Sequence, residues 1–288
     1  MQDISISGRG LKTVHKNISS IITWVFIFLA TALTIYPLFI MIMVSLKSTK
    51  EALISPNTFP TEIHWSNYSL AIQNMNMPRV LLNTTILTGV SVAGVIIIAG
   101  LASYPIGLSK RSKIYTIIYY FFLSGIMIPF YTTLVPLVEL MNDLHLTDSI
   151  PGMIIYYLGR RIPMDVFLYV GFVRGVPYEI IEAAKIDGAS IWQTYWRILF
   201  PVMKPITTTI MLLDSMGIWN NFLMPRLMLT SKANRTIALA QYYFRSENNN
   251  KWELTFAAYV LTLLPIVIFY FIFQKNIIKG VGAGAVKG

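Results

Sequence analysis

The chain has 288 residues, of which 55% are hydrophobic and only 12% charged, and its mean hydropathy is +0.60. Soluble domains carry about 25% charged residues, so this composition excludes an ordinary soluble protein and predicts an integral membrane protein. The chain has no cysteine and only three scattered histidines, which excludes disulfides and argues against a metal centre. The net charge of +10 could indicate a nucleic-acid-binding protein, or it could reflect the orientation of the chain in the membrane. The positions of the basic residues decide between these two interpretations.

Six apolar runs are long enough to cross a bilayer as helices, which takes about 20 residues. The predicted fold is therefore all-α integral membrane, with about six transmembrane helices. The first run follows the polar, basic residues 1–19 and is too long for the core of a cleaved signal peptide. Pro37 predicts a kink within it, and Pro129 and Pro136 interrupt the third run. The expected spans are residues 20–44, 81–105, 115–138, 150–173, 206–229 and 256–273.

We expect three parts: a cytoplasmic N-terminal segment over residues 1–19, a transmembrane domain over residues 20–275 and a cytoplasmic tail over residues 276–288. Six spans place both termini on one side. That side carries 13 Lys and Arg residues, and the other side carries 8 when its long loop is counted over residues 226–253. Cytoplasmic loops are enriched in Lys and Arg, so the termini and the loop 174–204 are predicted to be cytoplasmic. The positive charge is thus a topology signal, and nucleic acid is not an expected partner.

The loop 174–204 is a polar island in an apolar sequence. Pro177 suits the first position of a helix, where its missing N–H would have no partner. Gly188 can adopt the left-handed conformation that ends a helix. Ser190, with Gln193 three residues later, predicts a capping box at the start of the next helix. We therefore expect two short helices that dock onto another protein, and no catalytic site.

At fixed spacings the loop contains Glu182, Ala183, Ala184, Asp187 and Gly188, followed by Pro201 and Pro205. This extended pattern resembles the EAA loop of ABC-importer permeases. The resemblance implies that the loop carries the coupling helix by which the membrane subunit grips its cytoplasmic ATPase. Pro201 and Pro205 belong to the same pattern, and Phe200 stands where the family usually has Leu, which keeps that position apolar. The residues that the resemblance assigns to ATPase coupling are Glu182, Ala183, Ala184, Asp187 and Gly188.

The resemblance extends over almost the whole chain, to sugar-importer permeases of the MalG type. It implies the permease subunit of an ATP-driven importer for sugars, expected to be oligosaccharides, in the bacterial inner membrane. Its further motifs are Trp219-Asn220-Asn221-Phe222 with Pro225, Tyr36-Pro37-Leu38, Ser45-Leu46-Lys47, Asn67-Tyr68, Asn83-Thr84 and the tail 274–288.

The same resemblance implies the partners of the chain. They are a second, different permease subunit, two cytoplasmic ATPase domains, an extracellular or periplasmic solute-binding protein, the sugar and the lipid bilayer. The chain has no Walker A motif, no dinucleotide fingerprint and no His-Glu-x-x-His motif, so we expect neither an enzyme nor a bound cofactor, with ATP and Mg on the partner ATPase. On sequence alone, an importer for peptides or amino acids and a stand-alone channel or secondary carrier stay open.

Two adjacent arginines, Arg160 and Arg161, lie in the middle of the fourth span. A charged side chain at mid-bilayer costs at least about 2.5–3.5 kcal/mol, so both must face protein, water or a partner. We expect the helix to break over residues 159–165 and the arginines to line the substrate path, where their forked donors bind sugar hydroxyls or the carboxylate of an acidic sugar. The alternative is that one of them pairs structurally with Asp165 or Asp214.

Trp219, Asn220 and Asn221 offer an aromatic face beside two amides, which suits the apolar face and the hydroxyls of a sugar. They are further candidates for the substrate path. The alternative is that Trp219 anchors at the membrane interface and the asparagines bond between helices. In the tail, Gly282 and Gly284 permit unusual backbone conformations. We expect the tail to reach between the two ATPase domains, and the alternative is a frayed terminus.

Overall fold

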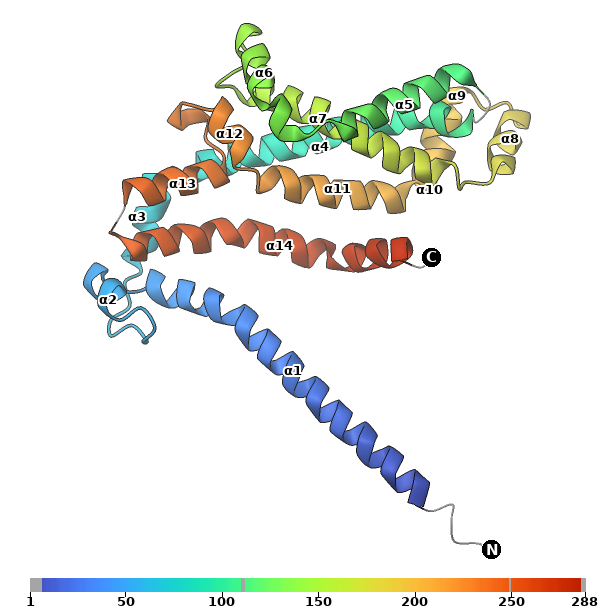
Figure 1. Cartoon of the computed structure of the whole chain (residues 1–288). Coiled ribbons are helices and arrows are strands. Elements are labelled where there is room, and N and C mark those ends of the chain that lie inside the picture. The colour runs from blue at the N-terminus through green and yellow to red at the C-terminus, as the bar shows by residue number, and fades with distance from the viewer. Residues whose placement is uncertain (1–6, 110–111, 249, 286–288) are drawn as a thin grey trace, which may run out of the picture. The chain divides into compact units, whose positions relative to one another are not determined.

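The computed structural model describes residues 7–109, 112–248 and 250–285, and these ranges contain helices and turns but no strand. This architecture confirms the predicted all-α fold class. The chain divides into two compact units, residues 1–71 with 248–261 and residues 72–247 with 262–288. Each unit is described by itself below, and Figure 1 labels the helices.

The first unit contains α1 (Ser7–Ser45), α2 (Thr49–Ile54), part of α3 (Ser66–Met75) and the start of α14 (Trp252–Ala285). α1 begins inside the segment 1–19 and continues through the predicted first span, with Pro37 inside it. From residue 20 to residue 39 its side chains are exposed. Lipid tails are as apolar as these side chains, so such a helix needs no protein contact in a bilayer.

A network of buried polar groups holds the chain after α1. Lys47 is fully buried, and its ammonium donates hydrogen bonds to the carbonyl oxygens of Ser55 and, at 3.3 Å, of Pro56. The Asn67 amide donates to the carbonyl oxygens of Ser45 and Lys47, both at 2.9 Å. A buried charge is stable only when it is hydrogen-bonded. Lys47 and Asn67 therefore fix the backbone of this turn.

The second unit is built around α4 (Met77–Leu108) and α7 (Ile150–Val173), which pack along their length. α5 (Lys113–Met127) and α11 (Lys204–Trp219) lie against this pair (Figure 1). Small, β-branched and aromatic side chains fill the core between α4 and α7, among them Val95, Ala99, Val166, Tyr169, Val170 and Val173.

Shorter elements connect these helices. They are α6 (Phe130–Asp143), α8 (Tyr178–Ile186), α9 (Ile191–Thr194), α10 (Phe200–Val202), α12 (Leu223–Met228) and α13 (Ile237–Glu247), with a π turn η1 (Tyr195–Leu199) and a 3₁₀ turn η2 (Lys232–Asn234).

Within the described ranges, three helices are long and apolar enough to cross a membrane: α1 from residue 20, α4, and α14 up to residue 273. Two bent pairs raise this number to five, because α5 meets α6 at 99° and the helix over residues 191–202 meets α11 at 72°. Figure 1 shows α6 turned away from the line of α5. α7 has 24 residues and measures about 36 Å, which is long enough to span, but it is not among these candidates because Arg160, Arg161 and Asp165 lower its apolar character.

One prediction about helix continuity is wrong. α7 is unbroken over residues 159–165, where a break was expected, because Pro163 removes only one backbone hydrogen bond and the charged side chains are accommodated by protein, as described below. In the tail, α14 continues to Ala285. Gly282 and Gly284 are therefore helical and do not adopt the unusual conformations that glycine would permit.

The fifth predicted span ends early, because α11 stops at Trp219 and not near residue 229. The two asparagines that follow end it. The Asn220 amide donates back to the Met216 carbonyl at 2.9 Å, and the Asn221 side-chain oxygen accepts from the N–H of Met224 at 3.2 Å. Such local bonds compete with the helix for its backbone groups.

The helix after α8 contains a π turn. α9, η1 and α10 follow one another without interruption, and the N–H of Phe200 bonds to the carbonyl of Tyr195, five residues earlier. A π turn accommodates one residue more than an α turn. With this extra residue, Tyr195 and Leu199 are both buried.

Asp148 joins the start of α7 to the chain that follows α12. Its Oδ1 accepts hydrogen bonds from the N–H groups of Thr230 and Ser231 and from the Ser231 hydroxyl, each at 3.0 Å, and its own N–H donates to the Met228 carbonyl at 2.7 Å. Burial by itself raises the pKa of this carboxyl, but the hydrogen bonds from Ser231 and Thr230 outweigh it and lower the pKa below the ordinary value. The charged form therefore stabilises the fold.

Asp148→Asn tests this connection, because Asn also tolerates the positive φ of 50° found here and keeps one acceptor oxygen. A carboxyl with a lowered folded-state pKa stabilises above its unfolded pKa of about 4 and loses that contribution as the pH falls through the folded value. We expect the variant to be about 1 kcal/mol less stable at pH 7, with a difference that shrinks between pH 5 and pH 3. Thermal unfolding in detergent measures it, with Asp143→Asn on exposed α6 as the control. A difference that stays constant with pH would contradict the assignment.

Candidate functional site

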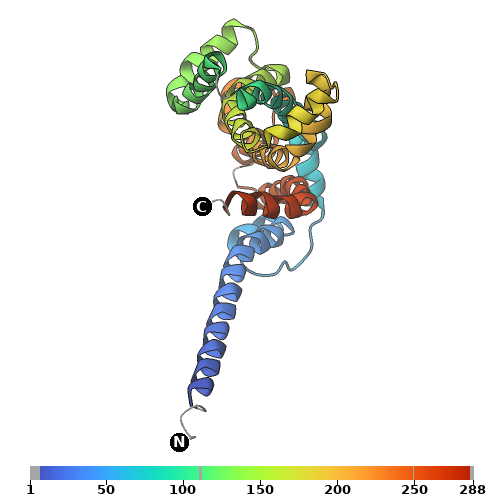
Figure 2. The same ribbon diagram turned by 90° about the vertical axis from the view of Figure 1, so that its right-hand side faces the viewer.

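α8 stands at one end of the second unit, the end that faces the viewer in Figure 2. It terminates as predicted: Gly188 has a left-handed φ of +78°, and the N–H of Ala189 bonds to the Ala184 carbonyl at 2.9 Å, as in a Schellman cap. The next helix starts with the predicted capping box. Ser190 Oγ accepts from the N–H of Gln193, and the Gln193 side chain accepts from the N–H of Ser190.

The two faces of α8 differ in exposure. Ala184 is buried, with 4% of its surface exposed, and it lies on the face of α8 that is turned away from the exposed residues. Glu182, Ala183, Asp187 and Gly188 are exposed. Large apolar side chains are also exposed nearby, and such patches mark protein contacts. We call this surface the loop face, formed by Glu182, Ala183, Ile186, Ile191 and Trp192.

A cavity of about 390 Å³ lies beside the middle of α7. Arg160 lines it, with its guanidinium carbon 5.3 Å from the centre of the Phe130 ring. Asn221, from the link after α11, lines the same cavity. We call it the arginine cavity, and its polar and aromatic lining consists of Phe130, Tyr156, Tyr157, Arg160, Arg161 and Asn221.

The two arginines have different surroundings. Arg161 pairs with Asp214 of α11, with 3.4 Å between Nη1 and Oδ1. Asp165, itself 3% exposed, interacts electrostatically with both partners. Within the described ranges no carboxylate lies within 4.0 Å of Arg160, which is exposed. Of the two arginines, Arg161 is therefore neutralised by Asp214, and Arg160 is available to a ligand.

Gly217 makes room for the Arg161 guanidinium. A Cβ atom at this position would lie 2.1 Å from Nη2 and 3.1 Å from Cζ of Arg161. Any larger residue therefore displaces the guanidinium, which Asp214 holds from one side. The ion pair between Arg161 of α7 and Asp214 of α11 therefore depends on Gly217, three residues after Asp214.

Gly217→Ala should destabilise the protein, because the added methyl group displaces Arg161 and weakens its pair with Asp214. In a helix without such a contact, Gly→Ala stabilises by about 0.5–1 kcal/mol. Gly171→Ala is the matched control, since Gly171 is in α7 and a Cβ there meets no atom within 4 Å. We expect a loss of about 1–3 kcal/mol for Gly217→Ala and no loss for Gly171→Ala, measured by thermal unfolding in detergent. If both variants were equally stabilised, the glycine would not support the pair.

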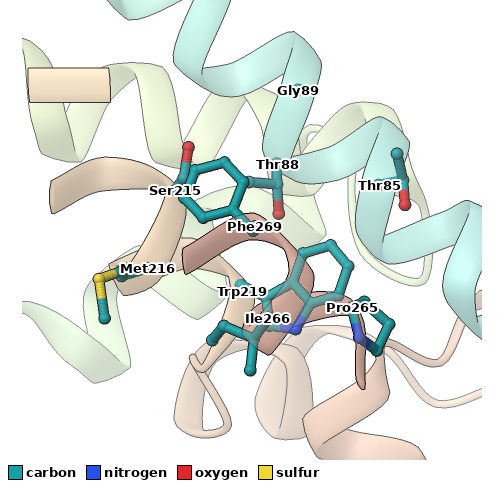
Figure 3. A pocket seen from close by; sticks show the side chains of 9 residues that line it. All are labelled: Thr85, Thr88, Gly89, Ser215, Met216, Trp219, Pro265, Ile266 and Phe269. Carbon is teal, nitrogen blue, oxygen red and sulfur yellow. The ribbon is translucent and has the colours of Figure 1, made fainter. Parts of the chain in front are cut away.

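Trp219 lies outside the arginine cavity. It lines a second cavity of about 230 Å³ between α4, α11 and α14, which Figure 3 shows from close by. We call it the tryptophan cavity. Asn220 lines neither of the two, and its amide bonds to its own helix. Of the five residues predicted for the substrate path, Arg160, Arg161 and Asn221 are therefore brought together, and Trp219 and Asn220 are not.

Several residues of these cavities carried no signal in the sequence. Phe130 belongs to an aromatic-rich region and adjoins Arg160 only because α6 turns away from α5. Thr88 of the tryptophan cavity is one of many hydroxyl residues in the spans. Tyr156 could have been suspected, since it precedes Arg160 by four residues and such pairs share a helix face.

These features define a class of protein. A helical membrane chain with two cavities among its spans and an exposed apolar face on a polar loop is suited to move a solute and to bind a partner. Among the described residues, no group of three or more His, Cys, Asp or Glu side chains could hold a metal ion. Both cavities are lined by polar and aromatic side chains.

The chain belongs to the family of binding-protein-dependent transport system inner membrane components, whose model matches residues 94–282. It is therefore a permease subunit, and ATP hydrolysis is the task of a separate subunit. The multiple sugar-binding transport system permease protein MsmG of Streptococcus mutans is 34% identical over 92% of this chain and 96% of its own. The melibiose/raffinose/stachyose import permease protein MelC of Bacillus subtilis is 34% identical over 88% of this chain and 91% of its own.

A solved structure has the same fold. It is the crystal structure of a bacterial ABC transporter involved in the import of the acidic polysaccharide alginate, one chain of which superposes with a TM-score of 0.78 at 20% identity, covering 91% of this chain and 97% of that one. This likeness supports the arrangement of the helices, and at such low identity it carries no information on the substrate.

Proposed function

We propose that this permease translocates oligosaccharides in an ATP-driven importer. The observation that carries the proposal is its 34% identity, over nearly the full length, to permeases named for the transport of sugars. The arginine cavity supports it, because forked guanidinium donors, tyrosine hydroxyls and aromatic rings suit a ligand with many hydroxyl groups and apolar faces. Arg160 is the residue that contacts the sugar. Arg161 positions Arg160, because its pair with Asp214 holds α7, which carries both arginines.

We further propose that the termini and the loop 174–204 are cytoplasmic, and that the loop face docks onto an ATPase domain. Lys and Arg are concentrated on this side of the chain, as in cytoplasmic loops. Ile186, Ile191 and Trp192 are 85%, 70% and 63% exposed, which an isolated polar loop does not require. The importer then also contains a second permease, a second ATPase domain and an extracellular or periplasmic binding protein that delivers the sugar.

Ala183→Trp tests the docking of the loop. Ala183 is exposed, so the fold should tolerate the indole, whereas an ATPase surface in close contact should not. We expect normal yield of the permease but loss of most of the co-purified ATPase and of the sugar-stimulated ATP hydrolysis. Ala183→Ser, which stays small, should behave as wild type. Full ATPase recovery and full stimulation in the tryptophan variant would refute the docking.

Arg160→Met and Arg161→Met, measured side by side, test the substrate path. Removal of Arg160 should reduce sugar uptake and leave the yield of the assembled importer unchanged, because no carboxylate depends on it among the described residues. Removal of Arg161 leaves buried Asp214 without its counter-ion, which typically costs about 3–5 kcal/mol, so yield and uptake should fall together. The measurements are uptake of labelled maltotriose, raffinose and arabinotriose into membrane vesicles, and complex yield in mild detergent. Normal uptake by Arg160→Met would remove this arginine from the path.

A further inference from the structure

A third cavity, of about 660 Å³, lies where three helices of the second unit end. Leu108 is the last residue of α4, Val173 is the last residue of α7, and Ser112 directly precedes α5. All three residues line the cavity, which we call the interfacial cavity. The ends of spanning helices lie at the level of the lipid headgroups in a bilayer, so this cavity lies at headgroup level.

Arg174 brings a positive charge to the interfacial cavity. It follows the last residue of α7 and lines the cavity, and its guanidinium carbon lies 4.6 Å from the centre of the Tyr119 ring in α5. Tyr119 is buried, with 9% of its surface exposed, so the ring holds one face of the guanidinium in place. No carboxylate of the described residues lies within 4.0 Å of Arg174. Its charge is therefore positioned by this part of the chain but not neutralised by it.

The Arg174 side chain turns back toward the spans. α5 and α7 run antiparallel, because Gly125 of α5 adjoins Pro163 of α7 whereas Tyr119 adjoins Arg174. Tyr119 belongs to the second turn of α5, so the guanidinium lies beside this turn and not in the loop that follows α7. A soluble domain docked on that loop approaches from the water, whereas lipid headgroups surround the ends of the spans. The position of the charge therefore favours a ligand that comes from the membrane.

The rest of the lining combines hydroxyl and apolar groups. Ser109 and Ser112 supply hydroxyls, and the Ser112 side chain does not cap α5. Hydroxyl and guanidinium donors suit the oxygens of a phosphate group. Leu108, Val173 and Val176 supply apolar surface. A free phosphate ion cannot pack against that surface, whereas the glycerol backbone and the first methylene groups of a phospholipid can.

We propose that the interfacial cavity binds the headgroup of an anionic phospholipid, whose phosphate is held by Arg174 and by the hydroxyls of Ser109 and Ser112. Basic pockets between spanning helices bind such headgroups in other membrane proteins. The sequence from Ser109 to Lys113 contains three further basic residues, and such clusters attract anionic lipids. The inference goes beyond the proposed function, because it does not depend on the transported solute. It uses the proposed topology only to assign the lipid to the cytoplasmic leaflet.

The test measures the phosphatidylglycerol that the assembled importer retains in mild detergent, by native mass spectrometry over a range of lipid concentrations. Arg174→Gln removes the charge, and we expect its apparent affinity for this lipid to fall about tenfold, which corresponds to about 1.4 kcal/mol. Arg174→Lys keeps the charge without the forked donors, so its affinity should fall less. Arg197→Gln is the matched control, because Arg197 is an exposed residue of the same loop and does not line the cavity. It should retain the lipid as the wild type does.

Two further ligands separate an anionic lipid from other sources of the same chemistry. Phosphatidylcholine has the phosphodiester and the acyl chains but no net negative charge, so it should be retained more weakly than phosphatidylglycerol. Glycerol 3-phosphate has the phosphate without acyl chains, so at equal concentration it should not displace the lipid. Equal retention of phosphatidylcholine, or displacement by glycerol 3-phosphate, would overturn the assignment to an anionic lipid.

Unchanged affinity for phosphatidylglycerol in Arg174→Gln would overturn the proposal. Loss of the co-purified ATPase in this variant, with unchanged lipid retention by the permease, would assign Arg174 to a protein contact and would overturn it as well. If Arg174→Gln failed to assemble, Arg174→Lys and the double variant Ser109→Ala/Ser112→Ala would decide, and wild-type affinity in both would refute the site. No sugar enters this measurement, so its failure and the failure of the proposed function are distinguishable.

Discussion

The pairing of Arg161 with Asp214 is the constraint on which the centre of the second unit depends. A guanidinium keeps its charge at any accessible pH, so α7 can carry it through a bilayer only beside a counter-ion. Asp214 supplies that counter-ion from α11, and Gly217 leaves the space in which the two groups meet. The pair joins two helices distant in sequence, and it leaves the neighbouring Arg160 directed to the arginine cavity.

The arginine cavity and the tryptophan cavity are lined by different helices. The arginine cavity is lined mainly by α7 with residues of α5, α6 and the link after α11, and the tryptophan cavity by α4, α11 and α14. α11 contributes Trp219 to the tryptophan cavity, and the link that follows it contributes Asn221 to the arginine cavity. In a continuous helix residues 219 and 221 would already point about 200° apart, so these two positions face opposite sides with or without the end of α11 at Trp219.

Much of this architecture could be predicted from the sequence, for identifiable reasons. The loop 174–204 was predictable down to Gly188 and the Ser190–Gln193 capping box, because helix ends are determined by local chemistry. The bounds of the fourth span were predictable, but its expected break was wrong. The charge of Arg161 is tolerated because of Asp214, which lies 53 residues further along the chain. The burial of Ala184 and the separation of Trp219 from the arginines are tertiary facts that no local pattern contains.

The π turn at Tyr195–Leu199 has a consequence for the direction in which the loop face points. In an α-helix each residue advances the chain by about 100° around the axis, so one additional residue turns everything before it by that angle relative to α11. The additional residue therefore contributes to the orientation of α8 toward a partner, together with the burial of Ala184. A permease with one residue more or fewer in this turn would present the same loop face in a different direction.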